Sequence, residues 1–181
     1  MKGITIKMKK ITHDEYYEKQ NEIAIDFLRS ASSEDRHGLV ATWNWDNGID
    51  VLKWIADDKG TDKATILMMY WMSQGPYFKK YENREDVPAW QLNEYDFLQK
   101  LEERLTSGFY QNNHFSYNPA NDDQGYNWTN EYDQSILDNL SEDLLTEIVG
   151  GKTPDIKHCY TWIEGLPEHV YSQLRDYEIE G

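Results

Sequence analysis

Hydrophobic residues recur along most of the chain with the spacing of amphipathic helices. Apolar positions three or four residues apart mark one face of a helix. Such faces predict helices within residues 12–31, 32–43, 49–56 and 88–108, and shorter helical segments within 132–140, 141–148 and 167–174. Thr12 and Ser32 stand where N-cap residues are expected, and each precedes acidic residues that suit the exposed amides of a first turn.

The segment of residues 63–74, KATILMMYWMSQ, has a different pattern, because it is apolar almost all the way round. A helix without a polar face is a buried one. Thr61 and Asp62 predict its start, and Gly75-Pro76 predicts its end. We therefore expect this helix at the centre of the core, with residues 65–72 as its most buried part.

Helical periodicity fails between Phe109 and Trp128, where Asn, aromatic and turn residues dominate. This stretch favours a long loop with a short strand or hairpin, and the run HCYTWI at 158–163 is also typical of a strand. The expected fold is mainly α, a compact multi-helix domain that can include a short β hairpin or strand pair in the C-terminal half. We expect a single domain over residues 1–181, with a basic N-terminal lead (1–11), a helical core (36–81) and an acidic C-terminal half (109–181).

Charge changes the picture of which partners the chain can have. The formal net charge is −15, although residues 1–10 carry four lysines and no acid. From Phe109 onward there are 14 acids and only three bases. Such a charge repels nucleic acid and anionic membranes and attracts basic surfaces. Acidic proteins are nevertheless common, and the alternative is that these acids serve only solvation.

The cysteine content and the apolar runs indicate a compartment. The single cysteine, Cys159, excludes an internal disulfide and favours a reducing environment. The N-terminal sequence MKGITIKMKK has no apolar stretch of the kind found in signal peptides. The longest apolar run is too short to span a bilayer. We expect a cytoplasmic protein.

Tests for catalytic and cofactor motifs predict no catalytic residue, no cofactor and no metal. Gly151-Lys152-Thr153 is not a phosphate loop, because Thr146 replaces the required glycine and Pro154 follows. The acidic loop of residues 118–127 lacks the spacing of a calcium loop. His158 and Cys159 lack the spaced partners of a zinc motif. Cys159 as a nucleophile beside a histidine is an alternative, but a small core residue is the favoured interpretation.

One stretch resembles an uncharacterised bacterial domain family. It runs His37-Gly38-Leu39-Val40-Ala41-Thr42-Trp43-Asn44-Trp45-Asp46-Asn47-Gly48, followed by a short helix, the Thr61-Asp62 start and the apolar run ATILMMYWM. The resemblance covers about residues 36–81 and implies no reaction and no cofactor. Small acidic proteins of this kind are similar to immunity members of bacterial toxin systems.

The residues of this motif have a structural interpretation. We expect His37 to be packed and hydrogen-bonded, Asn44 and either Asp46 or Asn47 to cap helix ends, and Trp45 to lock the helix pair. Gly48 supplies a backbone that needs no Cβ atom.

Two functions remain as hypotheses. The first is a non-catalytic immunity protein that neutralises a toxin by direct binding, with a basic nuclease as the leading candidate and with no nucleic acid or membrane as partner. Acids would steer association and aromatic anchors would form the centre of the interface, with Trp128 as the tryptophan most expected to be exposed. The expected partner-binding residues are Asp122, Asp123, Trp128, Glu131, Asp133, Asp138, Glu142, Asp143 and Glu147. The alternative is a small metabolic or nucleotide-processing enzyme that uses carboxylates, with or without a metal.

Overall fold

The computed structural model describes residues 8–180, and within them the protein is mainly helical, as predicted. The long helices are α1 (His13–Leu28), α2 (Ser33–Thr42), α3 (Asp50–Asp57), α4 (Lys63–Met72) and α5 (Leu92–Thr106). Three helices are short: α6 (Gln134–Leu137), α7 (Glu142–Leu145) and α8 (Glu168–Tyr171). Single turns of 3-10 helix connect them: η1 (Trp45–Asn47), η2 (Gly75–Lys80), η3 (Arg84–Asp86), η4 (Ala89–Gln91), η5 (Trp128–Glu131), η6 (Lys157–Thr161) and η7 (Ser172–Asp176).

Contacts group the chain into two compact units. The first unit ends at Val51 and resumes at Ile156, and the second unit runs from Leu52 to Asp155. The division falls inside α3, so that helix contributes to both. The predicted single domain stays a prediction.

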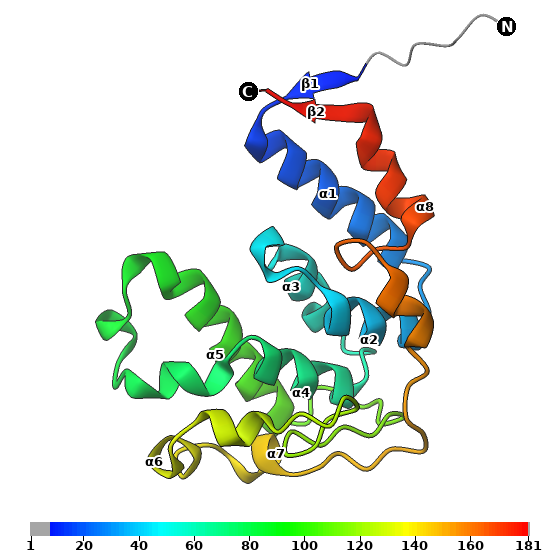
Figure 1. Ribbon diagram of the computed structural model, residues 1–181. Coiled ribbons are helices and arrows are strands. Elements are labelled where there is room, and N and C mark those ends of the chain that lie inside the picture. Colours follow the sequence, from blue (N-terminus) through cyan, green and yellow to red (C-terminus); the bar gives the residue numbers. More distant parts are fainter. Residues whose placement is uncertain (1–7, 181) are drawn as a thin grey trace, which may run out of the picture. The chain divides into compact units, whose positions relative to one another are not determined.

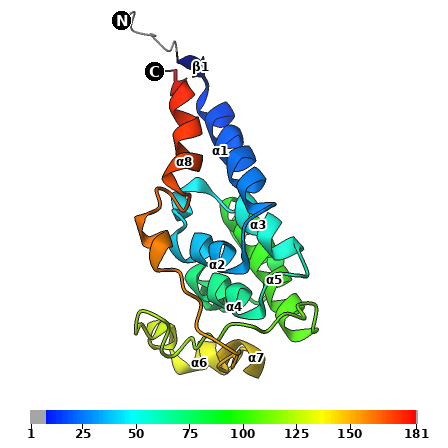
Figure 2. The ribbon, with the colours of Figure 1, turned by 90° about the vertical axis from the view of Figure 1, so that its right-hand side faces the viewer.

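The first unit joins the two ends of the described chain. Strand β1 (Lys9–Ile11) pairs in parallel with β2 (Tyr177–Ile179), with Lys9 opposite Tyr177. Helix α1 follows β1, and α8 with η7 lies beside it (Figures 1 and 2). A capping box begins α1, because the Thr12 side chain accepts from the Glu15 amide and the Glu15 carboxylate accepts from the Thr12 amide.

Two predictions about β structure were wrong: the placement of the whole strand pair in the C-terminal half, and the strand at residues 158–163. Only one strand of the pair, β2, comes from the C-terminal half, and its partner belongs to the basic lead, of which residues 1–7 lie outside the described residues. The run at 158–163 is not a strand, since 3-10 helix η6 occupies Lys157–Thr161. The stretch of residues 109–128 forms isolated bridges, such as Tyr117 with Ile148, and no hairpin of its own.

Helix α4 is the centre of the second unit, as its sequence predicts. Every side chain from Ala64 to Trp71 is buried. Asp62 caps the helix by accepting from the Ala64 amide at 3.1 Å, which satisfies one of the orphan donors of the first turn. The helix ends at Met72, and Gln74 takes a left-handed conformation just before Gly75.

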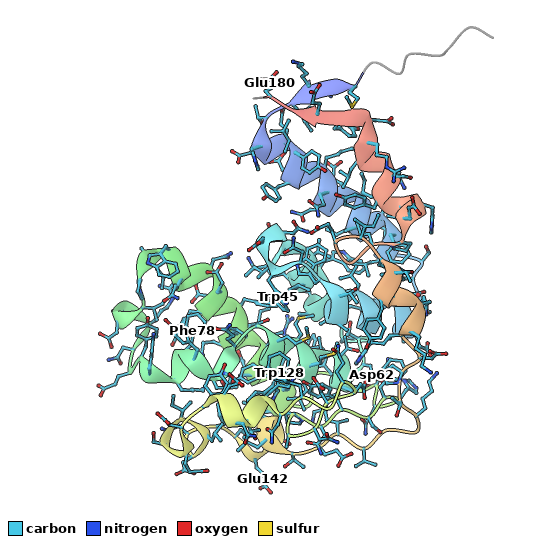
Figure 3. All side chains as sticks on the ribbon, viewed as in Figure 1. Trp45, Asp62, Phe78, Trp128, Glu142 and Glu180 are labelled. Carbon is cyan, nitrogen blue, oxygen red and sulfur yellow. The ribbon has the colours of Figure 1, made fainter. Side chains whose placement is uncertain are left out.

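Segments distant in sequence cover this helix. Helix α5 packs against α4 with an apolar stripe that includes Leu98, Leu101 and Leu105. The indole Nε1 of Trp71 donates to the Leu144 carbonyl at 2.8 Å and so ties α7 to the core. The buried carboxylate of Asp62, labelled in Figure 3, also accepts from the backbone amide of His114 at 2.7 Å. One acid thus both caps α4 and holds the loop that covers it.

We predict that Leu67→Ala lowers the free energy of unfolding by about 2–5 kcal/mol, because it removes a fully buried side chain and leaves a cavity. Glu103→Ala, on the exposed side of α5, is the control and should change stability by less than about 0.5 kcal/mol. Urea unfolding followed by circular dichroism measures both. Equal effects would contradict a central position for α4.

Candidate functional site

The residues Asn44-Trp45-Asp46-Asn47-Gly48, which we call the NWDxG motif, form a loop that is a capped 3-10 turn. Asn44 precedes η1, and its side-chain oxygen accepts from the Asp46 amide at 3.1 Å, so the predicted cap is present. Gly48 follows with φ +75°, a conformation that favours glycine. Its carbonyl accepts from the indole of Trp43 at 3.0 Å. The buried indole of this loop is Trp43, whereas Trp45 is half-buried.

Glu164 completes this loop from the other end of the chain. Ile163 and Leu166 exchange two backbone hydrogen bonds around Glu164 (φ +53°) and Gly165 (φ +79°), which is the geometry of a two-residue hairpin turn. The Glu164 carboxylate accepts from the side-chain amides of Asn44 and Asn47. Sequence reasoning missed Glu164, because Glu-Gly is not among the strong two-residue turn signals.

A small polar pocket of about 160 Å³ lies beside this turn in the first unit. Its lining includes Tyr16, Gln20, Tyr171 and Glu164. Burial is the main cause that raises the pKa of Tyr16, and the neighbouring Tyr171 is the second cause. Because both asparagine amides already engage the carboxylate, this cluster serves to join α1, the NWDxG loop and the Glu164 turn.

His37 is fully buried in α2, in agreement with the packing that the sequence predicts, while the predicted hydrogen bond of its ring stays a prediction. Burial lowers its pKa to about 4, and the nearby Glu34 opposes that shift only in part. The imidazole is therefore neutral at pH 7. A neutral, enclosed ring is a structural element of this helix rather than an accessible acid–base group.

The acidic candidates all lie in the second unit, between Asp122 and Glu147. All but Asp122 are exposed: Asp123, Glu131, Asp133, Asp138, Glu142, Asp143 and Glu147. Figure 3 shows Glu142 pointing away from the helices of its unit. The segment of residues 109–151 contains no lysine or arginine, so no base within it neutralises these acids. The result is a continuous stretch of chain with solvated negative charge.

Asp122 and Trp128 have a local structural role. The Asp122 carboxylate accepts from the amides of Gln124 and Tyr126 and from the indole of Trp128 at 2.9 Å. Trp128 is half-buried and stacks edge-on against Tyr126, with ring centroids 4.8 Å apart. The tryptophan with high exposure is instead Trp90, at 78%. The Asp123 residue is exposed as a whole. Partial desolvation of its carboxyl group and the charge of the neighbouring Asp122 together raise the pKa of that carboxyl.

Trp90 borders a groove of about 460 Å³ in the same unit. Tyr77 and Phe78 of η2, Trp90 of η4 and Glu94 of α5 contribute to its lining, and Figure 3 labels Phe78. The Glu94 Oε2 atom is buried, and no hydrogen-bond donor among the described residues reaches it. The groove thus combines aromatic rings with a carboxylate oxygen that lacks a partner within the described part of the chain.

A second groove, of about 330 Å³, adjoins the first through Tyr77, which lines both. Glu131 and Asp133, two of the predicted partner-binding acids, line this groove with Tyr132. Lys80 is also in the lining, with its Nζ 3.5 Å from the centroid of the Tyr77 ring. The tertiary structure therefore brings two predicted acids next to an aromatic groove that the sequence did not indicate.

The position of Glu94 in the sequence indicates burial of its side chain, although it was not among the predicted site residues. It stands four residues before Leu98 and seven before Leu101, so it shares the apolar stripe of α5. Burial of a carboxylate on a core-facing stripe costs free energy unless a hydrogen-bond or ion-pair partner compensates it. Trp90 gave no such signal, because its place just before a helix does not by itself indicate exposure.

One group of potential metal ligands occurs among residues 8–180: Asp35, His158 and Cys159. The His158 Nε2 atom lies 2.9 Å from Asp35 Oδ1 and 3.3 Å from Cys159 Sγ. A nucleophilic triad would need the imidazole to face the thiol and the acid with different nitrogens. Here one nitrogen faces both, so the group does not have the geometry of a cysteine protease.

The described residues form a mainly helical protein whose second unit has an aromatic groove and, next to it, a groove lined by Glu131 and Asp133. Residues 31–106, less than half of the chain, match the family model described as Domain of unknown function (DUF4274). This match includes the segment in which the sequence resembles an uncharacterised domain family. No curated protein and no solved structure matches the chain. Within the described residues, no helix is long and apolar enough to cross a membrane.

The buried His37 predicts a pH dependence of stability. Its pKa is lower in the folded state than the ordinary value of 6.5, so below pH 6.5 the unfolded chain binds a proton that the folded chain does not. The contribution of neutral His37 to the free energy of unfolding is fully present above pH 6.5 and is lost as the pH falls towards 4. We expect this residue alone to lower the free energy of unfolding by about 2 kcal/mol between pH 7 and pH 5.

The measurement compares the pH dependence of urea unfolding in the original protein, in His37→Gln and in His13→Gln. His37→Gln should lose this part of the pH dependence, whatever its absolute stability. His13 is exposed, and its replacement should leave the pH dependence intact. An unchanged pH dependence in His37→Gln would show that the ring is not held neutral by burial.

Proposed function

We propose that the protein is a non-catalytic binding protein that neutralises a basic protein partner, as a cytosolic bacterial immunity protein neutralises its cognate toxin domain. The observation that carries the proposal is the aromatic groove that Glu94 lines, because the Oε2 atom of this residue is buried without a donor from the described residues. A lysine or arginine side chain of a partner would supply that donor once the Glu94 carboxylate turns into the groove.

The groove has the chemistry to receive a cation. A buried charged oxygen without a hydrogen bond is costly, so a partner that satisfies it gains free energy that the isolated protein lacks. The exposed Trp90 ring adds a surface on which a guanidinium or ammonium group is attracted by the π system. An arginine fits best, since its planar fork can stack on the indole while it donates to the carboxylate.

The acids between Glu131 and Glu147 supply the long-range part of recognition. Exposed charges of one sign steer a basic partner towards the surface and raise the rate of association, while contributing little to the final affinity. Glu131 and Asp133 stand at the groove next to that of Glu94. Steering and anchoring are thus supported by neighbouring parts of one unit.

The class of partner follows from the same chemistry together with the resemblance. A toxin domain that cleaves nucleic acid carries a basic cleft, and an acidic protein can occlude that cleft. The resemblance seen in the sequence adds an immunity protein as the expected class. The test is co-expression with a basic toxin domain, taken from a neighbouring gene if one is encoded there, and the chain should restore growth.

We predict that Glu94→Gln weakens binding of that domain by roughly tenfold to hundredfold, because a charge-assisted hydrogen bond contributes about 1.5–3 kcal/mol. The free protein should become no less stable, because the substitution removes a buried charge that lacks a donor. Isothermal titration calorimetry with a catalytically inactive toxin domain gives the affinity, and urea unfolding gives the stability.

Glu103→Gln is the matched control, since Glu103 is an exposed acid on the same helix. It should leave the affinity within a factor of about two. Trp90→Ala should weaken binding through faster dissociation, as the loss of an aromatic anchor does. Unchanged affinity in both Glu94→Gln and Trp90→Ala would refute the groove as the binding site.

We predict that the triple reversal Asp133→Lys, Asp143→Lys, Glu147→Lys slows association by at least tenfold at low salt, because it removes steering charge from the proposed face. The difference from the original protein should shrink as salt rises, since the Debye length falls to about 8 Å at 0.15 M. Stopped-flow fluorescence measures the association rate across salt concentrations.

The control is the triple reversal Asp14→Lys, Glu18→Lys, Asp26→Lys on α1, where all three acids are exposed. It changes net charge by the same amount but lies in the other unit. A smaller effect on association supports a local acidic face. An equal effect would mean that only the overall field matters, and a larger one would move the binding face to α1.

A further inference from the structure

The group formed by Asp35, His158 and Cys159 lies in the first unit and has no part in the proposed binding face. Asp35 stands in the first turn of α2, and the other two residues belong to η6. Their ligand atoms all lie within 4.8 Å of one another. His158 is half exposed, Asp35 is less exposed and Cys159 is fully buried, so the group extends from the surface into the core.

One imidazole nitrogen faces both a carboxylate oxygen and a thiol sulfur. A neutral imidazole carries at most one hydrogen on Nε2, and that hydrogen cannot point well at both the Asp35 oxygen and the Cys159 sulfur. If Nε2 has no hydrogen, its lone pair faces a carboxylate oxygen 2.9 Å away. A cation in place of the shared hydrogen would satisfy nitrogen, oxygen and sulfur together.

Neighbouring residues hold the ligands in place. The other carboxylate oxygen of Asp35 accepts from the Ser32 hydroxyl at 2.8 Å, which leaves Oδ1 facing His158. Burial opposes ionisation of Asp35, but hydrogen bonds from His158 and Ser32 outweigh it and lower the pKa of this carboxyl. Gly38 admits the thiol, because a Cβ atom there would lie within 2.1 Å of Sγ.

We infer that Asp35, His158 and Cys159 form a binding site for one Zn²⁺ ion. Nitrogen, oxygen and sulfur ligands together suit a borderline-soft divalent ion, whereas Mg²⁺ and Ca²⁺ require oxygen ligands. Three protein ligands leave a fourth tetrahedral position for water on the exposed side of His158. Binding deprotonates the Cys159 thiol and releases that proton to solvent.

The required movement is small. Zinc bonds of about 2.0–2.1 Å to nitrogen and 2.3 Å to sulfur place tetrahedral ligand atoms roughly 3.3–3.7 Å apart. The nitrogen is now 2.9 Å from the oxygen and 3.3 Å from the sulfur, so these two pairs would separate by a few tenths of an ångström, and the oxygen and the sulfur already lie within 4.8 Å of each other. His158 can move outward, because its exposed side is not enclosed.

The test titrates the purified full chain with Zn²⁺ in competition with a chromophoric chelator, and separately with Co²⁺. We expect uptake of one Zn²⁺ per chain and, with Co²⁺, an intense thiolate-to-metal absorption that only a coordinated cysteine produces. His158→Gln should weaken Zn²⁺ binding by more than the roughly 10–100-fold that loss of an outer hydrogen-bond partner costs. Cys159→Ser should abolish the thiolate absorption.

His114→Gln is the matched control. His114 also lies beside a buried carboxylate, with Nδ1 3.4 Å from Asp62, but that pair has no thiol, so the variant should bind Zn²⁺ normally. His158 is half exposed, so its replacement leaves the core intact, and circular dichroism verifies folding. Absence of stoichiometric uptake, uptake that is unchanged in His158→Gln, or Co²⁺ spectra without thiolate absorption would each overturn the proposal.

Discussion

Helix α4 has no polar face, and the architecture of the second unit follows from that constraint. A helix whose side chains from Ala64 to Trp71 are all buried must be enclosed by other segments. Helix α5 covers one side, and the loop held by Asp62 and the α7 carbonyl held by Trp71 bring in residues more than 50 positions away. The polar atoms of Asp62 and the Trp71 indole therefore decide where the covering segments attach, while the apolar area supplies the driving force.

The same enclosure produces the proposed binding face. Because α5 presents its apolar stripe to the core, a carboxylate on that stripe, at Glu94, is carried below the surface at the start of the helix. The short turns η2 and η4 place Tyr77 and Trp90 around it. Stability alone would favour an apolar residue at Glu94, since an uncompensated charged oxygen costs free energy. Because Glu94 destabilises the free protein, a partner that compensates its charge would gain free energy at this position.

In the first unit, α2 combines several constraints within a few residues. Asp35 closes the capping box with Ser32, His37 is enclosed as a neutral ring, and Gly38 makes room for the Cys159 thiol. The Asp35 carboxylate uses one oxygen for the helix and presents the other to His158. The oxygen that faces His158 is thus not needed for the cap, and its coordination to zinc would leave the start of the helix unchanged.

The sequence by itself determined the helices, the buried character of α4, the N-caps at Thr12 and Ser32, and the packed His37, because periodicity and capping depend on residues close along the chain. It did not determine the pairing of β1 with β2, the helical state of η6, or the exposure of Trp90 in place of Trp128, since each depends on contacts between distant segments. Glu164 reaches Asn44 across 120 residues, and Asp35 reaches His158 across 123. No local pattern records those distances, so only the tertiary structure could place these side chains together.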